Sequence, residues 1–282
     1  MRPLPWLFLA AVVAAAPARA GVIVVTTTED LAAIVREIAG PDVKVRALLG
    51  GDKDPIAPRR LTPDMPVALL NADVLMAVGS GLEDRWLPGI VSASRNGIVQ
   101  PGSRGYLDLS AGIDLLEVPA GAAVAPGGDR PDGNPHYWLD PANGHRLAKA
   151  IVKKLSTLHA GGAAEFARRA QDFEGRLNEG EARWSLALAP FGGRKLAAYD
   201  KTWSYFANHF GLEILPAERL ADADAKILLV EPFVDTKAAG ALAAKAGGRV
   251  LVLPSSVGGV KAASGYVALF DEIVARLVAA LS

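Results

Sequence analysis

The sequence predicts an α/β protein of two lobes, each with a mostly parallel sheet flanked by helices, and one long backbone helix that bridges them. Short runs of β-branched and aliphatic residues alternate with helical segments at the spacing of parallel crossovers. One long amphipathic segment, 161–188, interrupts that alternation, which then resumes. We therefore divide the chain into a secretion signal, an N-terminal lobe, a linking helix and a C-terminal lobe, at 1–20, 21–160, 161–190 and 191–282.

The first twenty residues have the features of a secretory signal. Arg2 precedes an apolar stretch from 4 to 16, and Ala18-Arg19-Ala20 fits the small-x-small pattern of a cleavage site. The apolar stretch is shorter than the ~20 residues that a membrane-spanning helix needs. We expect cleavage near Gly21 and a soluble, periplasmic mature protein.

Composition excludes several classes of function. Thirty basic and thirty acidic residues give no net charge, which argues against nucleic acid as a partner. The chain has no cysteine, so disulfides, thiolate metal sites and cysteine nucleophiles are excluded.

The N-terminal lobe reads as strands and helices in alternation. Buried strands are indicated by aliphatic runs, and helix starts by capping residues and acidic first turns. The loop 119–133 is rich in proline and glycine and is predicted to lie on the surface. We predict strands at 22–28, 43–49, 73–78, 106–109 and 114–118, and helices at 29–39, 62–71, 79–93 and 142–158.

The linking helix is indicated by an apolar stripe at alternating steps of four and three residues. The stripe comprises Phe166, Ala170, Phe173, Leu177, Trp184 and Leu188. A helix this long must bury such a stripe, so we expect these side chains in the core. After it we predict strands at 195–199, 226–230 and 249–253, and helices at 201–210, 235–246 and 265–281.

The segment from Gly133 to Pro141 concentrates the least ordinary chemistry of the chain. Pro135 stiffens it and presents His136, one of only four histidines, from a non-helical position. A histidine held this way is a candidate ligand or acid/base group. A buried structural histidine is the alternative. We interpret the other three, His145, His159 and His209, as surface or capping residues.

Two carboxylates are predicted to face the same cleft as His136. Asp200 and Glu231 each follow a strand of the C-terminal lobe, and the carboxyl ends of parallel strands are where α/β proteins bind ligands. Asp54 lies in the turn-rich loop after the second strand, and Asp235 follows Glu231 closely. An enzyme is disfavoured, because no motif provides an activated nucleophile or oxyanion donors.

Taken together, these segments resemble the metal-specific solute-binding proteins of bacterial ABC importers that serve zinc and manganese uptake. The resemblance covers nearly the whole mature chain in order. It rests on the post-signal strand and helix, Gly51-Asp52-Lys53-Asp54-Pro55, Leu70-Asn71-Ala72-Asp73-Val74, Gly79-Ser80-Gly81-Leu82-Glu83, Pro135-His136-Tyr137-Trp138-Leu139-Asp140-Pro141, Trp203-Ser204-Tyr205-Phe206, Phe210-Gly211-Leu212-Glu213 and Val230-Glu231-Pro232-Phe233.

The metal ligands that the resemblance implies are only partly present. Members of that family hold the metal with three histidines and one carboxylate between the lobes. Here Ile56 stands at the first histidine position, His136 is retained, and Asp200 stands at the third. The fourth position falls near Pro254-Ser255-Ser256, which has no carboxylate. The metal candidates of this chain are therefore His136, Asp200, Glu231, Asp235 and Asp54.

The resemblance implies an exported binding protein that passes zinc or manganese to a permease in the inner membrane, acting as a monomer and not as an enzyme. One imidazole with carboxylates makes a weaker zinc site than three imidazoles and shifts preference toward manganese. Metal should be lost below about pH 6.5, the ordinary histidine pKa. The alternative is a binding or accessory protein of the same fold that has lost metal and recognises another small ligand or a partner protein.

Overall fold

The computed structural model describes residues 21–120, 132–221 and 225–282. The predicted signal and most of the predicted loop 119–133 lie outside these residues. None of the helices in the described part of the chain is long and apolar enough to span a lipid bilayer.

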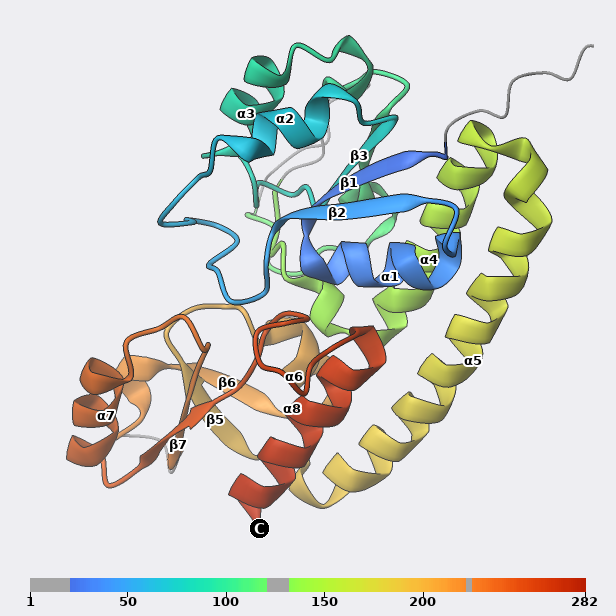
Figure 1. Cartoon of the computed structure of the whole chain (residues 1–282). Coiled ribbons are helices and arrows are strands. Elements are labelled where there is room, and N and C mark those ends of the chain that lie inside the picture. Colours follow the sequence, from blue (N-terminus) through green and yellow to red (C-terminus); the bar gives the residue numbers. More distant parts are fainter. Residues whose placement is uncertain (1–20, 121–131, 222–224) are drawn as a thin grey trace, which may run out of the picture.

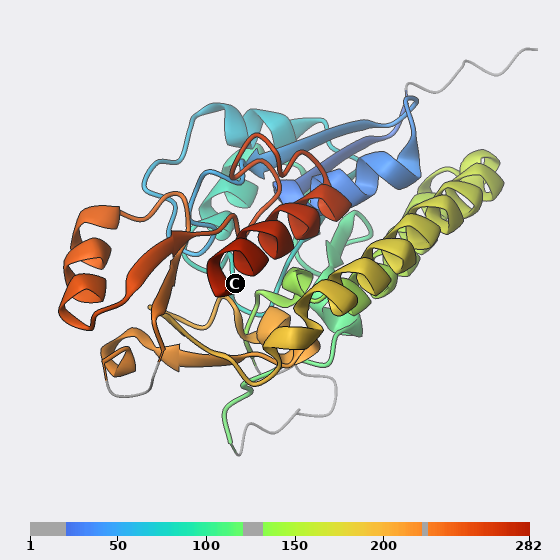
Figure 2. The same cartoon turned by 90° about the horizontal axis from the view of Figure 1, so that it is seen from below.

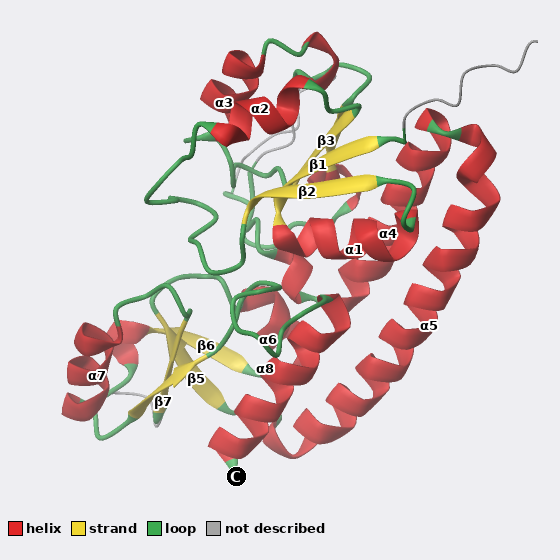
Figure 3. Cartoon of the chain, viewed as in Figure 1, coloured by secondary structure: helices red, strands yellow, loops and turns green. Residues whose placement is uncertain are grey.

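The N-terminal lobe is a four-stranded parallel sheet covered by helices on both faces (Figures 1 and 3). Its strand order is β2-β1-β3-β4. The strands are β1 (Ile23–Thr28), β2 (Lys44–Leu49), β3 (Val74–Ala77) and β4 (Tyr106–Asp108), and the helices are α1 (Glu29–Ala39), α2 (Asp64–Leu70), α3 (Leu87–Ser94) and α4 (Pro141–Leu158).

The C-terminal lobe repeats this plan with a second parallel sheet of order β6-β5-β7-β8. The strands are β5 (Lys195–Ala198), β6 (Glu213–Pro216), β7 (Ile227–Val230) and β8 (Arg249–Val252), and the helices are α6 (Ser204–Phe210), α7 (Thr236–Lys245) and α8 (Tyr266–Leu281). The fold class predicted from the sequence is therefore confirmed.

The bridging helix is α5 (Ala163–Leu188), 26 residues long, which runs along one side of both lobes (Figures 1 and 2). Its predicted apolar stripe is buried, from Phe166 at one end to Leu188 at the other. Gly180 belongs to the same buried face, because a Cβ there would lie 2.7 Å from the Trp184 ring. Trp184 in turn stacks on Phe270 of α8, with ring centroids 4.9 Å apart.

The largest hydrophobic core is shared by the two lobes. Val24 of the first sheet, Phe173 of α5 and Leu229 of the second sheet belong to one cluster of buried side chains. Two smaller clusters lie on the outer faces, one between the first sheet and α2 and α3, the other between the second sheet and α7. The lobes are therefore packed on a common centre as well as joined by the bridging helix.

Two local predictions were wrong for reasons of backbone geometry. The helix expected from 79 begins at Leu87, because Gly79, Ser80 and Gly81 have φ values of 77°, 52° and 79°. A right-handed helix cannot contain such residues. Glu83 fixes this turn, since its two carboxylate oxygens accept the N–H groups of Val78 at 2.8 Å and Gly79 at 2.9 Å.

The strand predicted at 114–118 is also absent from the described structure. Glu117 has a φ of 57°, which an extended strand does not allow. The Leu116 N–H donates to the Tyr205 hydroxyl at 2.9 Å, and its carbonyl accepts the Asn134 N–H at 2.8 Å. Residues 114–118 thus pack beside α6 and the segment that carries His136, and they do not join a sheet.

Candidate metal site between the lobes

His136 lies at the junction of the two lobes and is almost completely buried, with 6% of its surface exposed. It comes directly before a short 3₁₀ turn, Tyr137–Leu139, whose three side chains are buried. Tyr137 donates to the Val78 carbonyl at 2.6 Å, and the Trp138 indole donates to the Ser255 carbonyl at 2.8 Å. The segment is therefore fastened to both lobes, and His136 has little freedom to move.

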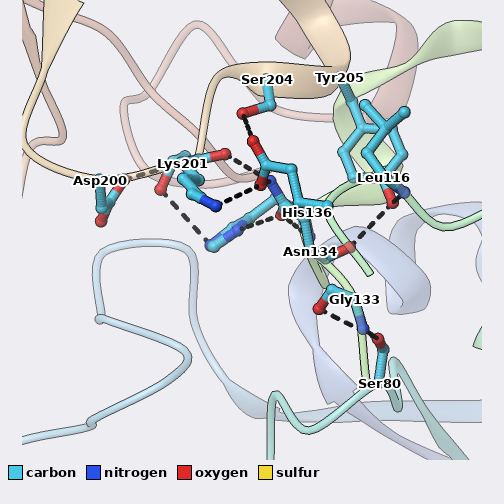
Figure 4. Close-up of polar contacts among 11 residues, drawn as sticks. Ser80, Leu116, Gly133, Asn134, His136, Asp200, Lys201, Ser204 and Tyr205 are labelled. Atoms are coloured by element: carbon cyan, nitrogen blue, oxygen red, sulfur yellow. Dashed lines mark hydrogen bonds and ion pairs between the residues drawn. The ribbon is translucent and has the colours of Figure 1, made fainter. Parts of the chain in front are cut away.

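Asn134 determines which nitrogen of His136 carries the proton. Its Oδ1 lies 3.0 Å from both the backbone nitrogen and the Nδ1 of His136. Its amide nitrogen donates to Glu117 at 3.0 Å and to the Lys201 carbonyl at 2.7 Å, which fixes the orientation of the amide (Figure 4). Because Oδ1 can only accept, Nδ1 must be the protonated nitrogen. Nε2 then keeps its lone pair and faces Thr202 Oγ1 at 3.4 Å.

The charge state of His136 also suits a ligand. Burial lowers the pKa of His136 to about 4, and the nearby carboxylates of Asp200, Asp54 and Glu117 only partly oppose this effect. The imidazole is therefore neutral at neutral pH, as a metal ligand must be. This corrects the expectation of an ordinary histidine pKa.

Two of the predicted carboxylates, Asp200 and Asp54, lie close enough to His136 to act on it electrostatically. Asp200 follows β5 and accepts the Thr202 N–H at 2.9 Å. Asp54 accepts the N–H groups of Ile56 at 2.9 Å and Ala57 at 3.1 Å. Both carboxylates act electrostatically on His136 and also on Glu231. Carboxylates that follow strands of both lobes thus lie near His136 and Glu231.

Glu231 is the buried carboxyl of this group, with 5% of its surface exposed. Its Oε1 accepts the indole N–H of Trp203 at 2.9 Å. Burial, followed by the charges of Asp200 and Asp54, raises the pKa of Glu231 to about 7. The group therefore changes charge close to neutral pH.

Asp235 does not join the others. It is exposed, and its Oδ1 accepts the Lys237 N–H at 2.9 Å as the N-cap of α7. The structure therefore gives Asp235 a role in helix capping.

Two positions at which the resemblance implies a metal ligand carry residues that do not bind metal, and their surroundings differ. Ile56 is partly buried and packs against the large shared core. Ser255 and Ser256 are both buried in the loop after β8, and the next residue, Val257, donates its N–H to Asp30 of α1 at 2.8 Å. Within 21–120, 132–221 and 225–282, no three His, Asp or Glu side chains are grouped closely enough to hold a metal ion.

Sequence reasoning missed Asn134, Glu117 and Trp203 as supports of this site. Glu117 accepts hydrogen bonds from Asn134 and from Ser204, the latter at 3.0 Å, and so links the two lobes beside His136. The side-chain types alone carried no signal for these roles, because their partners lie far away in the sequence. Glu117 lies beside Asn134 because residues 114–118 do not form the predicted strand.

A cavity of about 1000 Å³ lies in the N-terminal lobe, next to the ends of β3 and β4. Ser80, Asp84, Tyr106 and Asp108 are among its lining residues. The described lining does not include His136, Asp200 or Glu231. Size alone therefore does not mark the site that the buried histidine and the strand-end carboxylates define.

Solved structures show which class of protein has this fold. A zinc-bound deletion variant of ZnuA superimposes with a TM-score of 0.78 at 23% identity, over 93% of this chain and 98% of that one. A manganese-bound periplasmic metal-binding protein from Candidatus Liberibacter asiaticus gives a TM-score of 0.77 at 18% identity, over 93% and 100%. The chain therefore has the same fold as these two proteins.

Sequence comparison identifies the family. The family model ZnuA, described as the periplasmic component A of the zinc-uptake complex, matches residues 24–221, and the chain belongs to this family. The zinc-binding protein TroA of Treponema pallidum is 26% identical over 194 residues, which are 68% of this chain and 58% of TroA. The zinc-uptake protein ZnuA of Paracoccus denitrificans is 32% identical over 90 residues, 32% of this chain and 28% of that relative. The matches thus span less than two thirds of either relative.

Asn134 gives a first testable prediction. Replacing it by alanine removes the acceptor that holds the Nδ1 proton of His136, so we expect a mixture of imidazole tautomers and a loss of metal affinity of about 10- to 100-fold, as for other outer-shell partners. Long-range ¹H–¹⁵N NMR of the ring nitrogens measures the tautomer without metal. Asn143→Ala is the matched control, because Asn143 is also buried but donates to the Tyr137 carbonyl at 3.0 Å. An unchanged tautomer in Asn134→Ala would contradict the assignment.

Proposed function

We propose that this chain is the exported substrate-binding component of an ABC importer and that its cargo is a divalent metal, zinc or manganese. The metal would lie between the lobes, on His136 and carboxylates from Asp200, Glu231 and Asp54. The observation that carries the proposal is the neutral, buried imidazole of His136, whose Nε2 is unprotonated beside these acidic groups. The partner that receives the metal is a permease in the inner membrane, and the chain acts as a monomer.

The names of the relatives support this proposal. They include zinc-uptake and zinc-binding proteins, and a manganese ABC transporter substrate-binding lipoprotein of Streptococcus anginosus that is 22% identical over 194 residues, 67% of this chain and 59% of its own length. One nitrogen ligand with oxygen ligands makes the site weaker for zinc than three imidazoles would, and relatively better suited to manganese.

Two observations favour a second candidate function. Ile56 packs against the core where a ligand would stand, and the described residues contain no ready group of three ligand side chains. A binding or accessory protein that has lost metal and recognises another small ligand or a partner protein would have these features. The two candidates differ in whether purified protein binds zinc or manganese at all.

The pH dependence of metal binding tests the proposal and the role of Glu231. Because its pKa is about 7, Glu231 must release a proton when metal binds below that pH. We expect affinity to rise with pH up to about 7 and then to level off, and to be lost altogether near pH 4, where His136 becomes protonated. Calorimetric titration of zinc and of manganese across this range measures the profile.

Glu231→Gln should bind metal more weakly, and its metal affinity should no longer rise as pH approaches 7. Glu213→Gln, a control at an exposed position, should show the same rise as the wild type. Binding of neither metal by the wild type at any pH would establish the second candidate. If the rise of metal affinity toward pH 7 persisted in Glu231→Gln, Glu231 would not be a ligand of the site.

A further inference from the structure

His209 lies between two carboxylates at a place where three parts of the molecule meet. Its Nδ1 is 2.8 Å from Asp140 Oδ1, and its Nε2 is 3.1 Å from Glu181 Oε1. His209 belongs to α6 of the C-terminal lobe, Asp140 precedes α4 of the N-terminal lobe, and Glu181 is on α5. The imidazole is 16% exposed, so these contacts are shielded from water. The surface or capping role predicted for His209 therefore does not describe it.

The geometry determines the protonation state of the ring. A neutral imidazole has one N–H donor and one acceptor nitrogen, whereas an ionised carboxylate only accepts. Both contacts can be hydrogen bonds only when both ring nitrogens carry a proton. We propose that His209 is an imidazolium bridge that fastens the C-terminal lobe to the N-terminal lobe and to the bridging helix, and that its deprotonation releases one of these attachments.

The surroundings of the bridge favour the cation. Among the described residues, Asp140 and Glu181 are the charged groups that face the ring, from the start of α4 and from α5. Phe210 lies beside it with ring centroids 4.6 Å apart. Tyr205 of α6 and Tyr266 of α8 are near Asp140, but both have pKa values raised above the ordinary one, chiefly by burial, and stay uncharged.

The pKa of His209 points the same way. Burial by itself would lower it, but the hydrogen bonds and charges of Asp140 and Glu181 outweigh burial, and the pKa is raised above its ordinary value. A histidine with a raised folded-state pKa stabilises the protein fully below the unfolded pKa of ~6.5 and loses this contribution as pH rises through the folded value. The bridge should therefore be complete below pH ~6.5 and be lost as pH rises through the raised pKa of His209.

The bridge lies close in sequence to both sides of the candidate metal site. Asp140 follows His136 by four residues, and α6 begins at Ser204, directly after Thr202 and Trp203. Thr202 contacts His136 and Trp203 holds Glu231. The bridge thus helps to fix the separation of the two segments that carry these groups. It needs no metal, so its test does not depend on the proposed function.

The first test is a pH titration of the histidine ring resonances by NMR, in metal-free mature protein. The chain has only four histidines, and single His→Gln variants assign their signals. We expect His209 to titrate above the ordinary ~6.5 and to show two ring N–H groups below its midpoint. Asp140→Asn, which keeps the helix cap, and Glu181→Gln should each lower the midpoint. A wild-type midpoint at or below the ordinary value, or one that neither variant moves, would overturn the proposal.

The second test measures stability by urea unfolding from about pH 5.5 to about pH 9, on either side of the ordinary histidine pKa. His209→Gln should lower the midpoint of unfolding most at the acidic end, and the difference from wild type should shrink as pH rises. His159→Gln is the control, because His159 is exposed. If His209→Gln lowered the midpoint of urea unfolding by the same amount at every pH, the ring would act only by packing, and the bridge would be rejected.

Discussion

Replacing His136 by alanine is expected to abolish binding of zinc and manganese, with a loss of affinity of more than about 100-fold. Removing an outer-shell partner of a metal ligand already costs ~10- to 100-fold, and His136 is the only nitrogen ligand of the proposed site. The remaining groups are carboxylates, of which Glu231 is partly protonated near neutral pH because its pKa is about 7. Calorimetric titration at pH 8, where Glu231 is ionised, isolates the contribution of the imidazole.

The control for this experiment is His159→Ala, since His159 is exposed and far from the site in sequence. His136 is buried and hydrogen-bonded, so the unfolding of each variant has to be followed by circular dichroism to establish that it is folded. Equal, tight metal binding by the wild type and a folded His136→Ala variant would place the site elsewhere in the molecule.

The second large effect is expected from restoring the family's ligand types. The double variant Ile56→His and Asp200→His would surround the metal with three imidazoles and a carboxylate, a favoured zinc environment. We expect zinc affinity to rise by on the order of 100-fold or more, because one substitution adds an imidazole ligand and the other replaces a carboxylate by an imidazole. The gain should be larger for zinc than for manganese, because imidazole nitrogen suits zinc better.

The matched control is Ile56→Gln with Asp200→Asn, which introduces polar groups of similar size without imidazole. Ile56 packs against the core, so both double variants should lose some stability, and only the histidine variant should regain it on adding zinc. If the restored protein bound zinc no better than the control, the loops that carry residues 56 and 200 would not face the same metal position.

The sequence was sufficient for the architecture because burial leaves a periodic pattern. The α5 stripe and the aliphatic runs of β1, β3 and β7 all became core. The edge strand β6 was missed, because its four residues, Glu213–Pro216, include only two aliphatic side chains between a glutamate and a proline. The turn 79–81 was taken for a helix start, although its two glycines suit the left-handed backbone that Glu83 holds in place.

In the candidate site, the sequence predicted only the residues that follow a strand or lie in a distinctive motif. Asp200 and Glu231 were found because each follows a strand, and His136 because its segment is distinctive. The support by Asn134 depends on contacts with Glu117 and Lys201, and the His209 bridge depends on Asp140 and Glu181. These partners meet only in the folded chain, so no local pattern could have identified them. Asp235 shows the reverse case, in which proximity in sequence to Glu231 suggested a ligand and the structure shows a helix cap.

The common core of the two lobes limits how far they can move apart. Because Val24, Phe173 and Leu229 belong to a single packed cluster, swinging the lobes apart as rigid bodies would expose buried side chains from both sheets. On the proposed function, entry and exit of the metal would then depend on the segments at the strand ends, around residues 50–57 and 200–203. Loop motions of this kind occur within nanoseconds to microseconds, whereas hinge closure of whole domains takes microseconds to milliseconds. On the proposed function, we therefore expect the time that a metal ion stays bound to be set by the strength of its own bonds and not by a hinge motion of whole lobes.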